Sequence, residues 1–522
     1  MRALGPGADG PRAVLGSQRV RMLRCSELLG ASSTSWPLRT GTVRGPSLFG
    51  VLIPSCRHWP LRNLTFPVQR DETAALNFEP HFEIMRRTFG QLLRARRFCC
   101  GISLLLATCA FGDTASRFAT SDITKPDFFP ILPWDPYHGW GKPFVEQRPN
   151  GLESLADCNF NMAGFVQPRD LRRCEKLHLG AIVLPADDDT NSPSFQRAWN
   201  KLSDEGIERR IKQIIRAAGK SPAIKGYFVY DEPGVADFPA LGKVVAAVKK
   251  FAPGKLAYIN LFPDYATLGA PDRSQLGTSN YTEYLERFVA EVNPQLISYD
   301  NYMVQYSDDL KDAAKAASYY HNLLEVRRVA QKHQLPCLNI VSINQIRPPA
   351  PIPSPANLQF QAYTTLAAGY RGVTWYNYFG PGYKYTAIDP AGRKTLTWVY
   401  LRDVNSQIAA LAPIMSRLAS TSVFFSAPAP VDNLPLLPGN LVQAVTCPTP
   451  VMVGEFKHSN GDSYVMVVNL SLERSALFTL TTRQPSASIK IVSAVDGSLS
   501  DFDQKNGLWL VAGQGALLAL GK

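Results

Sequence analysis

Between residues 125 and 420, eight short apolar runs alternate with longer helical patterns, and this alternation constrains the fold more than any other feature of the chain. Short apolar runs bounded by turn residues are typical of buried strands, and strands that alternate with helices are typical of a parallel sheet. Eight such units over this length match a (β/α)8 TIM barrel. A doubly wound open sheet is the alternative, but no glycine-rich phosphate loop follows the first run. The predicted strands are Phe129–Trp134, Asn161–Val166, Ala181–Leu184, Gly226–Tyr230, Leu256–Asn260, Leu296–Tyr299, Leu338–Ser342 and Gly372–Tyr376, and the helical patterns between them include Phe238–Phe251 and Tyr281–Val292.

The pattern changes near residue 420, where short β-rich runs replace the helical patterns. Turn signals such as Asn460-Gly461-Asp462 separate these runs. We therefore predict an antiparallel β-sandwich over residues 421–522, following a barrel over residues 125–420. The predicted sandwich strands are Ser422–Phe425, Leu441–Thr446, Val451–Lys457, Ser463–Leu470, Ala476–Thr482, Ile489–Ala494 and Leu508–Leu518.

The N-terminal part of the chain looks like a leader rather than a domain. Residues 1–84 show no sustained apolar period, and we interpret them as an upstream extension that adds nothing to the folded core. From Met85, a basic segment is followed by a 14-residue apolar run, Phe98–Phe111, and then by small residues up to Ser116. This order is typical of an export signal, so we predict a signal peptide over residues 85–116 and an exported protein, periplasmic or extracellular. The run is short for a bilayer span, although a short membrane anchor is the alternative.

The formal net charge of +12 is concentrated in that N-terminal part. Residues 1–115 hold 15 arginines, no lysine and 7 acidic residues, whereas residues 116–522 hold 40 basic and 36 acidic residues. A folded part with a charge of only +4 gives no electrostatic reason to expect a nucleic-acid partner. The barrel region has four histidines and neither a His-x-His pair nor an HExxH helix, so we expect no metal or other cofactor.

Polar and aromatic residues gather where the predicted barrel strands end. In a (β/α)8 barrel these ends share one rim, where the chemistry is found. Tyrosine and tryptophan faces together with neutral hydrogen-bonding groups suit a carbohydrate, although each residue could equally be loop packing. The candidate substrate-binding residues are Trp134, Asp135 and Tyr137 after the first strand, Gln167 after the second, Asn260 on the fifth, Tyr299 and Tyr302 at the sixth, and Trp375, Tyr376 and Asn377 at the eighth.

Two adjacent carboxylates, Asp231 and Glu232, follow the fourth strand and precede a Pro-Gly stop. A capping aspartate followed by a glutamate in the first turn of a helix would have the same pattern. Cleavage of a glycosidic bond needs one protonated carboxyl and a second group that attacks or stabilises the anomeric carbon. Glu232 is our candidate acid, and Asp231 would raise its pKa or orient a substrate group. Asp300, on the sixth strand, is the third candidate, with a structural role as the alternative.

These residues resemble those of known families. Residues 125–420 resemble the (β/α)8 glycoside hydrolases, in particular uncharacterised secreted bacterial members of the clan that carries Asn-Glu-Pro after the fourth strand. The resemblance implies that Glu232 of Asp231-Glu232-Pro233 is the acid/base, with Asp in place of Asn, and Trp375 also fits. The clan has its nucleophilic glutamate after the seventh strand, but Leu338–Gln345 contains no carboxylate.

The Asp-Glu pair is also similar to the pair of hexosaminidases in which the substrate's own N-acetyl group attacks. That resemblance implies that Asp231 orients the acetamide and Glu232 is the acid. Ser298-Tyr299-Asp300 is similar to the Tyr-Asp after the sixth strand of family 18 chitinases. Attack would come from Asp300, from water or from the substrate, and the tyrosines that flank Asp300 favour Asp300. A barrel that binds carbohydrate without cleaving it is the remaining alternative.

Overall fold

The computed structural model describes residues 128–134, 151–184, 199–267, 274–346, 348–379, 383–484 and 488–521. The predictions for residues 1–84 and 85–116, and those for Asp135 and Tyr137, lie outside these ranges. Among the described residues, no helix has both the length and the apolar character needed to cross a bilayer.

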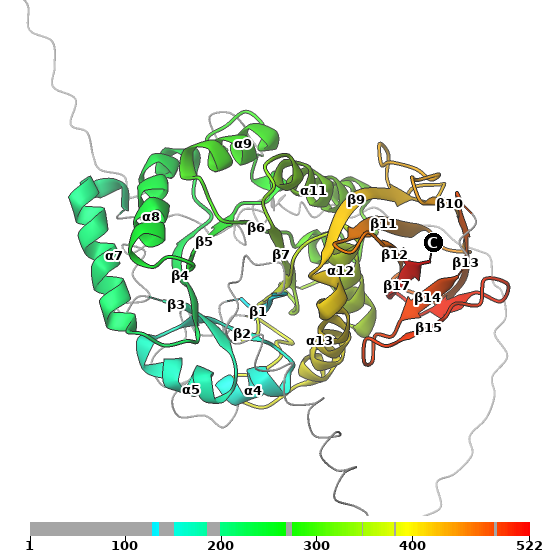
Figure 1. Cartoon of the computed structure of the whole chain (residues 1–522), viewed down its shortest axis with the longest axis horizontal. Coiled ribbons are helices and arrows are strands. Elements are labelled where there is room, and N and C mark those ends of the chain that lie inside the picture. The colour runs from blue at the N-terminus through cyan, green and yellow to red at the C-terminus, as the bar shows by residue number, and fades with distance from the viewer. Residues whose placement is uncertain are drawn as a thin grey trace, which may run out of the picture. The chain divides into compact units, whose positions relative to one another are not determined.

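Eight parallel strands form one barrel-like sheet, as the sequence predicted (Figure 1). The order β1-β8-β7-β6-β5-β4-β3-β2 follows the chain around the ring, because β1 pairs with β8 through Ile131 and Val373. Each observed strand begins and ends within two residues of its predicted bounds. The strands are β1 Ile131–Pro133, β2 Met162–Val166, β3 Gly180–Val183, β4 Ile224–Asp231, β5 Leu256–Leu261, β6 Ile297–Asp300, β7 Cys337–Ser342 and β8 Val373–Tyr376.

Helices lie around the outside of the strands (Figure 1). Several begin at a residue whose side chain accepts from the free N–H groups of the first turn, as Ser203 does before α7, Asn280 before α9 and Ser354 before α12. The helices α8 and α9 coincide with the predicted ones. The described helices are α4 Leu152–Asp157, α5 Leu171–Lys176, α7 Asp204–Ala218, α8 Phe238–Phe251, α9 Tyr281–Val292, α10 Met303–Tyr306, α11 Ala313–Lys332, α12 Pro355–Ala367 and α13 Leu396–Met415.

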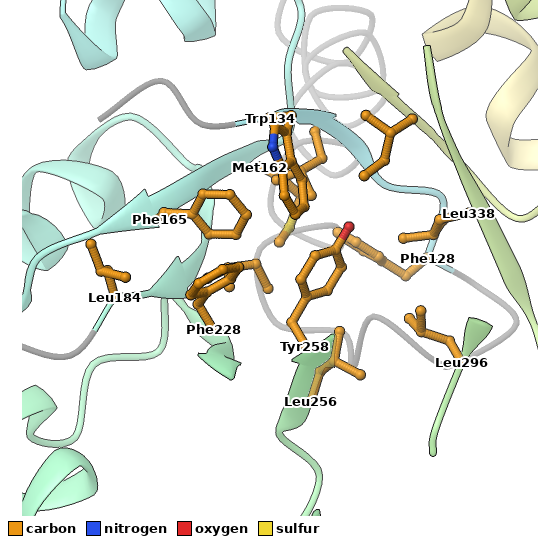
Figure 2. Packing of buried hydrophobic residues seen from close by; sticks show 13 residues of the cluster. Phe128, Trp134, Met162, Phe165, Leu184, Phe228, Leu256, Tyr258, Leu296 and Leu338 are labelled. Atoms are coloured by element: carbon orange, nitrogen blue, oxygen red, sulfur yellow. The ribbon is translucent and has the colours of Figure 1, made fainter. Parts of the chain in front are cut away.

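Side chains fill the barrel interior, as the two-residue period of each strand requires (Figure 2). On β5, Leu256 and Tyr258 belong to the buried cluster, and Leu338 and Ile340 do so on β7. Residues of opposite parity contact the helices instead, as Asn339 does by donating to the Thr365 hydroxyl of α12. This alternation decides which residues near the strand ends face the rim.

After α13 the chain forms two antiparallel sheets, which confirms the predicted β-sandwich. The larger sheet has the order β15-β14-β17-β12-β11-β9, and the smaller one β10-β13-β16. The prediction of one strand over Leu508–Leu518 is wrong, because the chain turns at Gly513, where φ is +74°, and makes two strands. The strands are β9 Leu418–Phe425, β10 Val442–Thr446, β11 Val451–His458, β12 Ser463–Asn469, β13 Ala476–Thr482, β14 Ile489–Val492, β15 Leu499–Asp501, β16 Leu508–Leu510 and β17 Gly515–Leu520.

Helix α12 serves both the barrel and the sandwich. Its residues from Asn357 to Ala367 are all buried, because β7 covers one side and strands of the larger sandwich sheet cover the other. A methyl group on Gly454 of β11 would lie 2.1 Å from the Ala367 carbonyl oxygen, and one on Gly515 of β17 would lie 2.6 Å from the Tyr363 ring. The absence of side chains at these glycines lets the sheet backbone approach the helix.

Candidate active site

The turn after β4 holds Glu232 in a backbone conformation that few non-glycine residues adopt. Its φ is +52°, and its N–H donates to the Asn260 carbonyl oxygen of β5 at 2.9 Å. The Tyr284 hydroxyl of α9 donates to the next carbonyl oxygen, that of Pro233, at 2.7 Å. Such a conformation costs a non-glycine residue about 1–2 kcal/mol. The surrounding hydrogen bonds therefore fix the direction of a half-buried glutamate at the rim.

Asp231 and Asp300 are linked through one amide group. The Asn260 Nδ2 donates to Asp231 Oδ1 at 3.1 Å and to Asp300 Oδ1 at 3.0 Å. Because both oxygens bond to the same nitrogen, they lie within about 6 Å of each other. The barrel thus brings together carboxyls that are 69 positions apart in the sequence.

A chain of hydroxyl groups continues from the same amide toward the barrel interior. The Ser298 Oγ donates to Asn260 Oδ1 at 3.2 Å. Since a serine has one hydroxyl proton, the 2.9 Å contact between Ser298 and Tyr258 is made by the Tyr258 O–H donating. Tyr258 is also part of the buried cluster of Figure 2, so the hydrogen-bonded chain is anchored in the hydrophobic core.

Asp300 is almost completely buried, with 2% of its surface exposed. Burial first and the nearby Asp231 charge second raise the pKa of the Asp300 carboxyl to about 8, and the hydrogen bonds from Asn260 and Tyr302 oppose the rise. Asp231 is half-buried instead. At neutral pH the Asp300 carboxyl is therefore mostly protonated, and the two neighbours differ in their solvent access.

Three tyrosines in mutual contact form a wall, and one of them, Tyr302, borders these carboxyls. The rings of Tyr302 and Tyr376 lie 5.0 Å apart, and the Tyr376 hydroxyl hydrogen-bonds to that of Tyr383. The pKa of Tyr302 is raised well above its usual range by burial and then by Asp300, with a smaller contribution from Glu232. Tyr302 therefore lies close enough to both Asp300 and Glu232 to interact with their charges.

Three aromatic residues predicted at the rim lie elsewhere. Trp134 is a member of the buried cluster and packs edge-on against Phe165 with ring centroids 4.6 Å apart (Figure 2). Tyr299 points to the opposite face of β6 from Asp300 and lies against Tyr370, with centroids 6.1 Å apart.

The third residue, Trp375, has no exposed surface, and its Nε1 donates to Asn405 Oδ1 of α13 at 2.8 Å. Its indole therefore lies between β8 and the helix layer, where no sugar can stack on it. The two predicted polar residues differ from each other: Gln167 is half-buried at the end of β2, and Asn377 is buried.

The sequence interpretation missed Ser298, Tyr258 and Tyr383. Ser298 lies two residues before Asp300, and Tyr258 lies two residues before Asn260. Because strand residues two apart face the same side, the sequence could have predicted that both face the site. Tyr383 lies in the segment after β8 and had no such signal.

No carboxylate stands at the ends of β7 and β8. The sequence contains no Asp or Glu between Val326 and Ile388. At the end of β7 stands Asn344, which is fully buried and whose side-chain amide has no hydrogen-bond partner among the residues that the structure describes. Within the described ranges, no group of three or more His, Cys, Asp or Glu side chains could hold a metal ion.

Comparisons with known proteins find likeness in structure alone. No protein-family model matches the chain, and no curated protein matches it. Solved structures that it resembles include a catalytic mutant of Gan42B, a GH42 β-galactosidase from G. stearothermophilus, at 9% identity and a TM-score of 0.47, covering 78% of this chain and 99% of that one. The GH51 arabinofuranosidase from Xanthomonas axonopodis pv. citri is similar at 12% identity and a TM-score of 0.40, over 76% of this chain and 97% of that one.

The β-galactosidase from Marinomonas ef1 is similar at 10% identity and a TM-score of 0.37, and the match covers 54% of this chain and 59% of that enzyme. All three are glycoside hydrolases by name. At these identities and TM-scores, they say nothing about the chemistry of this chain, which must be argued from its own residues.

Proposed function

We propose that this chain is a glycoside hydrolase that cleaves N-acetylhexosaminides, with Glu232 as the general acid and Asp231 as the group that orients the substrate's acetamide. The observation that carries the proposal is the pair of adjacent carboxyls at the rim end of β4, with Asp231 held by the Asn260 amide. A neighbouring tyrosine wall of Tyr302, Tyr376 and Tyr383 is suited to the apolar face of a sugar.

In the proposed first step, the acetamide oxygen attacks the anomeric carbon and the bond from that carbon to the leaving oxygen breaks. Glu232 gives its proton to the leaving oxygen, and Asp231 accepts a hydrogen bond from the acetamide N–H, whose positive charge grows. In the second step, water attacks the anomeric carbon and gives a proton back to Glu232. The bond from that carbon to the acetamide oxygen breaks, which restores the acetamide. The sugar leaves with its original anomeric configuration, because the carbon is inverted twice.

Two features favour substrate attack over attack by an enzyme carboxylate. The strand that carries the nucleophile in the resembling clan, β7, ends without a carboxylate, and so does β8. Asp300, which the sequence favoured as nucleophile, is buried and protonated near neutral pH, and a neutral carboxyl is a poor nucleophile.

The test is a comparison of aryl N-acetyl-β-hexosaminides with the matching aryl glycosides that lack the acetamide. The expected result is cleavage of the N-acetyl substrates alone. Glu232→Gln should fold normally and lower the turnover of a substrate with a poor leaving group by at least about a hundredfold. Glu205→Gln, an exposed change in the first turn of α7, is the matched control and should leave turnover unchanged.

Comparable rates on substrates without the acetamide would contradict the mechanism and favour attack by water or by a carboxylate. The second candidate function is a barrel that binds carbohydrate without cleaving it, which the lack of a carboxylate on β7 and β8 favours. Saturable binding of N-acetyl sugars without cleavage of any aryl glycoside would establish that candidate instead.

A further inference from the structure

Asn260 lies where β4, β5 and β6 meet, and both N–H groups of its amide are used. The residue has 2% of its surface exposed. Its two N–H groups go to Asp231 and Asp300, and its oxygen accepts from Ser298. Buried polar groups are costly unless they are bonded in this way, and this amide has no N–H left to donate to a sugar hydroxyl.

The orientation of the amide is fixed by its neighbours. Turning it by half a turn would place the Oδ1 against the Asp231 and Asp300 carboxyls, where Asp231 in its ionised form has no proton to donate. The Tyr258 hydroxyl donates to Ser298, which leaves the Ser298 proton for the Asn260 oxygen. Each group in this network therefore donates to the next one, from the Tyr258 hydroxyl through Ser298 and Asn260 to the two carboxyls.

We propose that Asn260 is a positioning residue that, by donating to both carboxyls, holds Asp231 apart from Asp300 and aims the Asp231 carboxylate at the substrate's acetamide. This inference deepens the proposed function and rests on it for the role of the acetamide. Because Asn260 supplies a donor to each carboxyl, neither needs the other as a hydrogen-bond partner. Without Asn260, the two carboxyls lose the donor that lies between them, and Asp231 loses one of the contacts that fix its direction.

The same hydrogen bond from Asn260 holds the pKa of Asp300 down, whereas burial and then the Asp231 charge raise it. Glu232 adjoins Asp231 in the chain. The tyrosines whose pKa is raised in part by the charge of Asp231 or Asp300 include Tyr258 from β5, Tyr302 from the turn after β6, and Tyr281 and Tyr284 from α9. Burial is the first cause of the raised pKa of each of these tyrosines.

The kinetic test uses Asn260→Leu, which keeps the side-chain volume and removes every hydrogen bond. On an aryl N-acetyl-β-hexosaminide, kcat should fall at least about tenfold while KM stays within about twofold, because misalignment of Asp231 costs transition-state stabilisation rather than binding. Asn339→Leu is the matched control, a buried strand asparagine on β7 that faces α12, and its kcat and KM should stay at the wild-type values.

The second readout does not depend on catalysis. The infrared absorption of protonated carboxyls in the full chain, assigned to Asp300 by its loss in Asp300→Asn, should titrate near pH 8 in the wild type. In Asn260→Leu its midpoint should rise by about one pH unit, since a donor to the ionised form is lost. In Asn339→Leu the midpoint should not move.

If Asn260→Leu fails to fold, Ser298→Ala, which frees the amide and leaves Asn260 in place, should shift the midpoint in the same direction by a smaller amount. Unchanged kinetics in a folded Asn260→Leu that cleaves substrate, or an unchanged or lowered Asp300 midpoint, overturns the positioning role. If the wild type cleaves no glycoside, the proposed function fails, and the infrared midpoint alone decides whether Asn260 sets the protonation of the pair.

Discussion

At the scale of single residues, burial of Asp300 makes the stability of the fold depend on pH. The carboxyl of an unfolded aspartate titrates near pH 3.9, whereas the folded-state pKa of Asp300 is about 8. Between these values the folded chain binds the proton that the unfolded chain releases. The contribution of Asp300 is therefore most favourable below about pH 4 and is lost as the pH rises toward 8.

We predict that Asp300→Asn gains stability relative to the wild type as the pH rises from 5 to 8, by at most about 1.4 kcal/mol per pH unit. The measurement is the free energy of unfolding in denaturant at each pH. The exposed change Asp501→Asn on β15 is the control, and its difference from the wild type should stay flat over this range. A flat line for Asp300→Asn as well would mean that the Asp300 carboxyl is ionised in the folded chain.

The residues of the candidate site were predictable where position along a strand decides their place. Asp231, Glu232 and Asp300 follow apolar strands, and the barrel brings Asp231 and Asp300 to the same amide. Tyr299 was misplaced because it adjoins Asp300, and consecutive strand residues face opposite sides. Asn260 was found, but as a substrate-binding residue. Its hydrogen bonds to two carboxyls depend on how three strands lie side by side. The sequence of a single strand gives no indication of such bonds.

At the scale of elements, the fit between β11 and α12 depends on a glycine. A methyl group on Gly454 would lie 2.1 Å from the Ala367 carbonyl oxygen, and backbone atoms have no rotamer by which to move away. Gly454→Ala should therefore lower the free energy of unfolding by about 1–3 kcal/mol.

The measurement for this prediction is denaturant unfolding, with Gly206→Ala on α7 as control. A methyl group there would lie no closer than 3.3 Å to its nearest neighbour, a side chain, and alanine favours a helix, so stability should stay equal or rise. Equal stabilities of Gly454→Ala and the wild type would show that β11 is free to shift on the helix.

Element bounds followed from the sequence where the apolar pattern was strong, as for α8, α9 and the barrel strands. The strand β15 was missed because all three of its residues are exposed and carry no burial pattern. The turn that separates β16 from β17 was missed because apolar residues continue on both sides of Gly513. The left-handed conformation at that glycine, which makes the turn, is not visible in a hydrophobicity pattern.

At the scale of the whole molecule, the barrel and the sandwich should unfold together. Helix α12 buries its residues against both, so neither can unfold without exposing part of the other's core. We predict that hydrogen exchange at β5 in the barrel and at β12 in the sandwich is lost at the same denaturant concentration. In Gly454→Ala, protection at β5 and at β12 should both be lost at the same, lower denaturant concentration. Loss of protection at β12 well before β5 would show two independent units.

The change of pattern near residue 420 predicted a barrel followed by a β-sandwich, and the structure contains both in that order. The sequence did not show that a barrel helix serves the sandwich. A helix without a charged residue is the trace of that double role in the sequence, and it is equally the trace of any deeply buried helix.

The double role of α12 also bears on how such a chain is inherited and engineered. Recombination at the start of β9, Leu418, would deliver a sandwich without the helix that its larger sheet packs on, and a barrel with one helix face uncovered. A functional exchange of the sandwich between two such proteins must therefore carry residues 355–367 with it, or exchange both halves of the contact at once. We therefore expect the two folds to be exchanged as one piece, even though their secondary structures change type at a single point in the chain.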